Sequence, residues 1–333
     1  MARSDQRSAP VWLLLLDCCP FPSLEYQRSA TADSTDWHPF DDLDAEALFF
    51  EQYYSRHPTA DCSVTDYLGG PEVCRRFQAR MQVAGKCCRH AELTGTGSGN
   101  SELPESRSGL CSSLSSDTVG DSAHEPDLLV FTATGCESSE TLTAVLHRFR
   151  SLQHTCSDST QKPTLIITGF RGLSRNLPKQ FAAPCSETEI HVPLWILSSN
   201  SRATRVQMLC GSSDLLPTIS ELLALPPEPK SGAVPQHDQT TPLQLAPLSL
   251  LSISQLHPES LQRMLTISGD GWIGLRTQQY FLVRPASTGS DEQELESCSL
   301  YQKPDDFWNV NNTISACEEI ATAMLDAAAA GPS

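Results

Sequence analysis

The amino-acid sequence lacks an apolar stretch near its N-terminus that could span a membrane or form the core of an export signal. The run there extends only from Val11 to Leu16 and is closed by Asp17, whereas a membrane span needs about 20 residues. The 13 cysteines also lack any C-x-x-C spacing, the arrangement typical of structural zinc sites. We therefore expect a cytoplasmic protein with reduced thiols and no cysteine-bound metal.

Basic residues are scarce as well. The chain has 23 Lys and Arg against 40 Asp and Glu, which gives a formal net charge of −17 at pH 7. An acidic surface repels polyanions, so we expect neither nucleic acid nor a membrane surface as a partner. With 333 residues, the chain is long enough to bury one large core. One large α/β domain, or a large domain with a small appendage, is therefore the expected organisation.

Short apolar runs alternate with segments of helical periodicity. The predicted strands are Val11–Leu16, Asp127–Thr132, Thr164–Thr168, Val192–Leu197 and Tyr280–Arg284. The predicted helices are Asp41–Tyr54, Pro71–Ala84, Ser138–Leu152, Asp214–Leu225 and Ile314–Ala330. This alternation indicates an α/β fold with a mainly parallel central sheet and helices on both of its faces.

Two stretches of unusual composition interrupt the pattern. Residues 85–126 are rich in Ser and Gly and poor in apolar side chains, which predicts a flexible insert. Residues 226–247 are rich in proline and predict a linker. The expected organisation is a main α/β domain at 9–225, the linker at 226–247, and a C-terminal portion at 248–330 that completes the fold.

Several local motifs occur in a particular order along the chain. The first apolar run ends in Asp17-Cys18, and the run that ends at Thr168 is followed by Gly-Phe-Arg-Gly. The segment from Tyr54 to Gly70 lies between them and contains Ser63 ahead of a Leu-Gly-Gly sequence. The other motifs are Leu43–Phe50, Ile190–Ile196, Ser213–Ile219, Trp272–Thr277 and Leu300–Asn312.

Taken in this order, the motifs resemble those of the sulfatase family within the alkaline-phosphatase-like hydrolases. The resemblance extends from about Val11 to Asn312, apart from the insert. It implies the same mainly parallel sheet with helices on both faces, completed by a small C-terminal α+β portion. It also gives particular positions in the chain a chemical meaning.

In that family, a pair of carboxylates after the first strand and an Asp-His pair after a later strand hold a divalent cation, typically Ca²⁺. Asp17 matches the first ligand, and Cys18 stands where the second is expected. Phe170 and Arg171 take the places of the Asp and the His. A lone carboxylate cannot hold Ca²⁺, which takes about six to eight oxygen ligands. The resemblance therefore implies that this chain binds no metal and needs no cofactor.

The family's nucleophile is a Cys or Ser that is converted to formylglycine, with an arginine nearby that positions it. When the segments are aligned without gaps, Ala60 stands at the nucleophile position and Val64 at the arginine position. Because Ala60 has no nucleophilic atom, we expect no catalytic residue. The vestigial pocket that the resemblance implies consists of Asp17, Cys18, Ala60, Phe170 and Arg171.

The sequence thus predicts a sulfatase-like protein that has lost sulfuric-ester hydrolysis and acts as a non-catalytic binding or regulatory module. Its partner is an unidentified protein or a small anion. Two alternatives stay open. One is an active sulfuric or phosphoric ester hydrolase with ligands from unaligned residues such as His57, Asp61 or Asp66. The other is a small-anion binding protein that uses Arg171, with Asp17 as its salt-bridge partner.

Simpler interpretations apply to several of these side chains. Arg171 at a former metal position is expected mainly to neutralise Asp17. Cys62 lies two residues from the former nucleophile and has no obvious base, so a structural thiol is expected. His38, His57 and His191 are expected to be solvated histidines.

Overall fold

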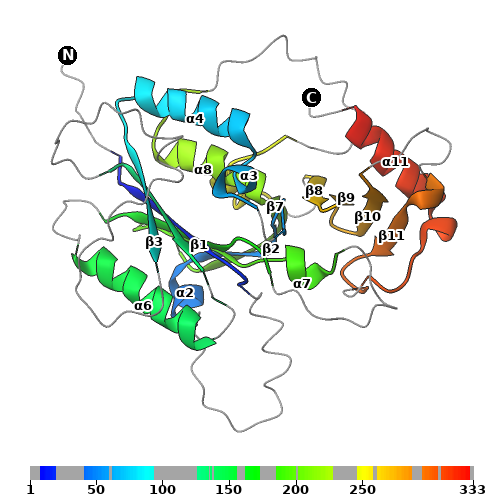
Figure 1. Ribbon diagram of the computed structural model, residues 1–333, viewed down its shortest axis with the longest axis horizontal. Coiled ribbons are helices and arrows are strands. Elements are labelled where there is room, and N and C mark those ends of the chain that lie inside the picture. The colour runs from blue at the N-terminus through cyan, green and yellow to red at the C-terminus, as the bar shows by residue number, and fades with distance from the viewer. Residues whose placement is uncertain are drawn as a thin grey trace, which may run out of the picture.

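The structure is a computed structural model of the chain. It describes residues 8–19, 41–59, 62–93, 126–134, 136, 139–155, 162–172, 185–199, 202–227, 246–257, 261–286, 295–306 and 309–330. Two sheets organise these residues (Figure 1).

The larger sheet has seven strands in the order β3-β4-β1-β5-β6-β2-β7. Its strands are β1 Val11–Leu16, β2 Leu48–Tyr54, β3 Cys88–Leu93, β4 Leu128–Ala133, β5 Thr164–Gly169, β6 Leu194–Leu197 and β7 Thr204–Gly211. β1 pairs in parallel with both β4 and β5, and only β6 is antiparallel to its neighbours. The predicted mainly parallel central sheet is therefore confirmed.

Alternate side chains of β1 supply two separate cores on the two faces of this sheet. Leu13 and Leu15 join the first core, whereas Trp12, Leu14 and the other even-numbered residues of the strand join the second. All six residues of β1 are buried, as expected for a strand covered on both sides. Each fully buried leucine contributes about 2 kcal/mol of hydrophobic stabilisation.

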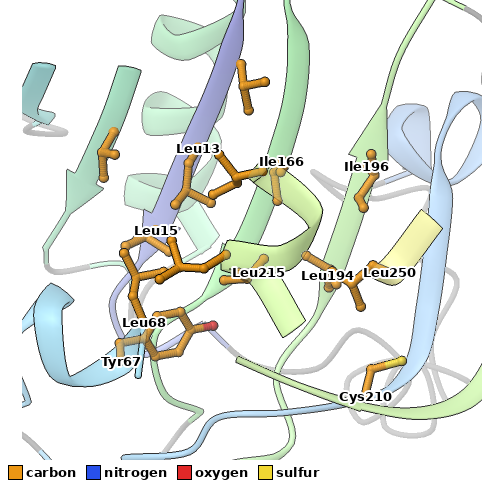
Figure 2. Close-up of a cluster of buried hydrophobic side chains, with 14 of the residues drawn as sticks. Leu13, Leu15, Tyr67, Leu68, Ile166, Leu194, Ile196, Cys210, Leu215 and Leu250 are labelled. Carbon is orange, nitrogen blue, oxygen red and sulfur yellow. The ribbon is translucent and has the colours of Figure 1, made fainter. Parts of the chain in front are cut away.

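Helices cover both faces (Figure 1). The first core includes side chains of α3 Val64–Tyr67, α4 Pro71–Val83, α8 Leu215–Leu222 and α9 Leu250–Ile253. The second includes side chains of α2 Asp41–Glu46 and α6 Ser139–Thr155. Figure 2 shows the first core, where Leu13, Ile166 and Leu194 of three adjacent strands lie close to Leu215 of α8. Helices were predicted at α4, α6 and α8, and the structure confirms them.

The predicted helix at Asp41–Tyr54 is wrong over its second half. The helix ends at Glu46, and Leu48–Tyr54 forms strand β2, which pairs with β6 and β7. Its sequence, Leu-Phe-Phe-Glu-Gln-Tyr-Tyr, is rich in aromatic residues, which favour strands. Leu43, Ala47 and Phe50 follow a helical spacing in the sequence, but Phe50 belongs to the strand.

The predicted insert at 85–126 begins too early. Cys88–Leu93 forms β3, an edge strand that pairs with β4. Its polar residues are compatible with a strand because only β4 pairs with it and several of its side chains are exposed. The rest of the predicted insert, residues 94–125, and residues 228–245 of the predicted linker lie outside the described residues.

The smaller sheet is formed by β8 Leu265–Gly269, β9 Trp272–Arg276, β10 Tyr280–Pro285 and β11 Ser299–Gln302, all antiparallel in the order β11-β10-β9-β8. Helix α11, Glu318–Ala329, packs on it through Ala321 and Met324. A third core that contains Tyr54, Leu209, Ile267 and Phe281 joins the two sheets. This arrangement confirms the predicted small C-terminal α+β portion.

Candidate functional site

The carboxyl ends of β1 and β5 meet at one edge of the larger sheet, which is where open α/β sheets place their sites. The two strands are in register, with Leu16 opposite Gly169. Just beyond them, the amide of Phe170 donates to the carbonyl of Leu16 at 2.7 Å, and the amide of Cys19 donates to the carbonyl of Arg171 at 3.0 Å. These reciprocal bonds hold the two strand ends together.

An ion pair forms at this edge. Arg171 Nε donates to Asp17 Oδ1 at 2.8 Å, and Arg171 Nη2 lies 3.5 Å from Oδ2. The side chains of Arg171 and Asp17 are only 24% and 29% exposed, respectively. The hydrogen bond to Asp17 is the main cause that raises the pKa of Arg171 above its ordinary value. The guanidinium therefore stays charged and neutralises the carboxylate.

Cys18 lies in the turn that follows β1. Its backbone is in the left-handed region, with φ of 53°, which is uncommon for a residue with a side chain. Its thiol donates to Asp17 Oδ1 at 3.5 Å. Nearby, Cys136 is buried, its thiol donates to the carbonyl of Ala133, and burial raises its pKa to about 12. Cys136 is therefore a protonated thiol at neutral pH.

Phe170 stands where the sulfatase resemblance expects a metal-binding carboxylate. Its ring stacks on that of Tyr67, with centroids 4.8 Å apart and an interplanar angle of 17°. The hydroxyl of Tyr67 donates to the carbonyl of Gly169 at 2.9 Å, and Ser55 Oγ donates to the carbonyl of Phe170 at 2.7 Å. Phe170 therefore contributes aromatic packing and no oxygen ligand from its side chain at this position.

The nucleophile segment is only partly described. Ala60 and Asp61 lie outside the described residues. Ser63 caps helix α3 in a capping box, in which its hydroxyl donates to Asp66 Oδ2 at 2.6 Å and accepts from the Asp66 amide at 3.2 Å. Val64, at the arginine position, is buried in the first core. Ser63 and Asp66 therefore have a local structural role, as a capping box normally does.

The other reactive side chains of this segment have perturbed pKa values. Burial raises the pKa of Cys62 to about 12, so its thiolate is not populated at neutral pH. Burial is also the main cause that lowers the pKa of His57 below its usual value. His57 is half-buried rather than fully solvated, so the expectation of a solvated histidine holds only in part.

The structure also contains a buried charge cluster that the sequence did not indicate. Glu187 Oε1 accepts from the hydroxyl of Tyr54 at 2.7 Å and from Arg276 Nη2 at 3.2 Å, while Glu187 Oε2 lies 3.1 Å from Lys303 Nζ. Burial by itself would raise the pKa of Glu187. The positive charges of Arg276 and Lys303 have the larger effect and lower this pKa to about 2. The cluster connects β2 of the larger sheet with the smaller sheet.

His191 lies beside this cluster. Its Nε2 donates to the carbonyl of Glu51 at 2.7 Å, and its ring stacks on Tyr54 with centroids 4.9 Å apart. Burial lowers its pKa to about 4, although the charge of Glu187 opposes this shift. His191 is half-buried against Tyr54 and the backbone of β2, so the expectation of a solvated histidine holds only in part. His38 lies outside the described residues.

The described part of the sulfatase-like pocket does not fit a divalent cation. Within the ranges that the structure describes, no group of three or more His, Cys, Asp or Glu side chains is placed to hold a metal ion. Asp17 already accepts two contacts from Arg171, and a guanidinium repels a cation at the same carboxylate. The donor set at this edge of the sheet therefore favours the arginine.

No protein-family model and no curated protein matches the sequence. Solved structures do match. Ps i-CgsB, solved in complex with k-i-k-neocarrahexaose, is 9% identical with a TM-score of 0.59 over 96% of this chain and 92% of the other. A 2-O GAG sulfatase is 11% identical, with a TM-score of 0.55 over 96% and 91% of the two chains. The chain has the sulfatase fold.

A protein of the alkaline phosphatase superfamily from Vibrio parahaemolyticus agrees, with 10% identity and a TM-score of 0.54 over 96% of this chain and 88% of the other. The predicted resemblance to sulfatases is thus confirmed for the fold, in a sequence that has diverged far from these structures. Among the described helices, none is long and apolar enough to cross a membrane.

Proposed function

We propose that this chain is a sulfatase-fold protein that does not hydrolyse sulfate esters and acts as a non-catalytic binding or regulatory module. The observation that carries the proposal is the ion pair between Arg171 and Asp17, with Nε and Oδ1 only 2.8 Å apart. This pair lies at the edge of the sheet where the sulfatase resemblance expects a cation.

The chemistry of sulfate ester hydrolysis explains why this pair matters. Negative charge develops on the sulfate oxygens and the leaving group, and a cation or oriented donors must stabilise it. Arg171 is already neutralised by Asp17. Loss of a single stabilising donor of this kind costs about 3–4 kcal/mol in the transition state, and Phe170 offers none.

The nucleophile segment supports the same proposal. The sequence alignment puts Ala60 and Val64 at the nucleophile and arginine positions, and Val64 is buried in the first core. Two nearby side chains are poorly suited to replace the missing groups. Asp66 accepts from Ser63, and the high pKa of Cys62 keeps its thiol protonated. These observations weigh against Asp66 and Cys62 as alternative catalytic groups.

An activity assay with aryl sulfates and aryl phosphates tests the proposal. Purified protein should show no turnover with or without Ca²⁺, Mg²⁺ or Mn²⁺. Ala60→Cys alone should remain inactive, because the charge-stabilising groups are still missing.

The matched control for this assay is Asp17→Ala. Activity from a contaminating host hydrolase would survive this substitution, whereas activity from a site built on Asp17 would not. Turnover by the wild-type chain that Asp17→Ala abolishes would show that the proposal is wrong.

A further inference from the structure

The Arg171 guanidinium binds the residue that the sulfatase resemblance assigns to the first metal ligand. Two of its nitrogens contact the two carboxylate oxygens of Asp17. The thiol of Cys18, the residue at the second ligand position, lies 3.5 Å from the same Oδ1. The Asp17 carboxylate therefore accepts from both Arg171 and Cys18. Arg171 already neutralises its charge without an added cation.

The backbone keeps Arg171 at this place. The amide of Phe170 donates to the carbonyl of Leu16, and the amide of Cys19 donates to the carbonyl of Arg171 itself, across the ends of β5 and β1. The next residue, Gly172, permits a close approach, because a Cβ there would overlap the carbonyl oxygen of Thr188. The turn that presents the arginine is therefore fixed by the packing of its neighbours and not by the ion pair alone.

Because Arg171 is covalently attached to the chain, its guanidinium competes for Asp17 more effectively than a cation from solution. A covalently attached partner acts at an effective concentration in the millimolar range or higher, and an entering cation would have to displace it while being repelled by it. Removal of the arginine would leave Asp17 as a poorly hydrated, uncompensated carboxylate, since its side chain is only 29% exposed. Such a group is destabilising.

We propose that Arg171 is a built-in cation that permanently replaces the divalent ion expected at Asp17, so that this edge of the fold is stable without metal. The proposal concerns the same site as the proposed function and rests on the same ion pair. Its consequences are measured by stability and not by turnover, so either proposal can fail without the other.

Thermal unfolding of the full chain in EDTA and in millimolar CaCl₂ tests this inference. Wild type should unfold at the same temperature in both. Arg171→Met should lower the midpoint in EDTA by about 3 °C, as expected for loss of roughly one kcal/mol in a chain of this size. Ca²⁺ should not restore this loss, because a lone carboxylate cannot hold the ion.

A double variant and a control variant distinguish the effect of the Arg171 charge from the effect of its packing. Asp17→Asn combined with Arg171→Met should be more stable in EDTA than Arg171→Met alone, and Ca²⁺ should not affect it, since no carboxylate remains to be compensated. Arg75→Met is the control, because Arg75 forms an exposed pair with Glu72. It should leave the midpoint within about half a degree of wild type.

Two results would contradict this inference. A saturable rise in the wild-type midpoint with Ca²⁺ would show that the site takes a divalent ion despite Arg171. A double variant that is no more stable in EDTA than Arg171→Met alone would show that Arg171 acts through packing alone. If Arg171→Met does not fold, Arg171→Gln applies the same test with a polar side chain, and the same two results would contradict the inference.

Discussion

Two carboxylate–guanidinium pairs in this molecule look similar but have different surroundings. Asp214 and Arg263 form a bidentate pair at 2.8 and 2.9 Å, and their side chains are 0% and 1% exposed. Asp214 also accepts from the amides of Gly211 and Leu248, both at 2.9 Å. The Asp17–Arg171 pair, in contrast, is partly exposed and includes one long contact.

The two pairs lie in different parts of the molecule. One belongs to the scaffold of the fold, and the other lies at the candidate site. Asp214 belongs to the Asp-Leu-Leu-Pro-Thr motif that resembles the sulfatases. Its four contacts connect it to the end of β7, to the segment before α9 and to Arg263, which precedes β8. Arg171 stands where that resemblance expects another residue. Asp214, which matches the sulfatase-like motif, holds the scaffold together, whereas Arg171 lies where the resemblance expects a metal ligand.

The turn after β5 shows the same division within a few residues. Thr168 lies 3.4 Å from the hydroxyl of Tyr67, and Gly172 makes room for the carbonyl of Thr188. Both match the family's Thr-x-Asp-His-Gly pattern. Between them, Phe170 and Arg171 stand where the resemblance expects Asp and His, and they form an aromatic stack with Tyr67 and an ion pair with Asp17.

The largest expected effect is the loss of the buried pair. Asp214→Ala should lower the free energy of unfolding by about 3–5 kcal/mol, because it leaves Arg263 charged and unpaired in the interior. Asp17→Ala should cost only about 1 kcal/mol, since water reaches Arg171. Chemical denaturation measures both, with the exposed Asp270→Ala as a control. Equal losses at Asp214 and Asp17 would contradict the comparison.

A smaller, pH-dependent effect is expected at His191. Its folded pKa of about 4 lies below the ordinary value of about 6.5 for an unfolded chain. Between these values the unfolded chain binds a proton that the folded protein does not, so stability falls as the pH decreases from 6.5 towards 4. We expect a loss of about 2 kcal/mol from this residue, allowing for partial solvent access.

The measurement for His191 is denaturation at a series of pH values. His191→Gln should flatten the stability profile between pH 6.5 and 4 relative to wild type. His147→Gln is the matched control, because His147 is exposed on α6, and its profile should follow that of wild type. If His191→Gln and wild type lose stability in parallel over this range, the imidazole is not held neutral as the structure indicates.

Much of the fold could be predicted because its signals are local. β1, β4 and β5 are continuous apolar runs, and Pro71 marks the start of α4. β2 was misassigned because its aromatic residues follow a genuine short helix without a break, and pairing with distant segments decided its structure. β7 was not predicted, although polar and apolar residues alternate along its first half as in a half-buried strand.

The candidate site was predictable only where a family pattern could be aligned. Asp17 and Arg171 were singled out together as possible partners from their positions after two predicted strands, and the structure places them in contact. The cluster of Glu187, Arg276 and Lys303 had no such signal. Its members lie on a short helix, a strand and a turn that are far apart in the sequence, so their charges meet only through the packing of the two sheets.

Elemental analysis of the purified full chain tests the central claim most directly. Inductively coupled plasma mass spectrometry should find divalent metal far below one ion per chain, both in wild type and in Asp17→Ala, because Arg171 already neutralises the only carboxylate that matches the family's ligands. A stoichiometric divalent ion in the wild-type protein that disappears in Asp17→Ala would contradict the account and identify this edge of the sheet as a working metal site.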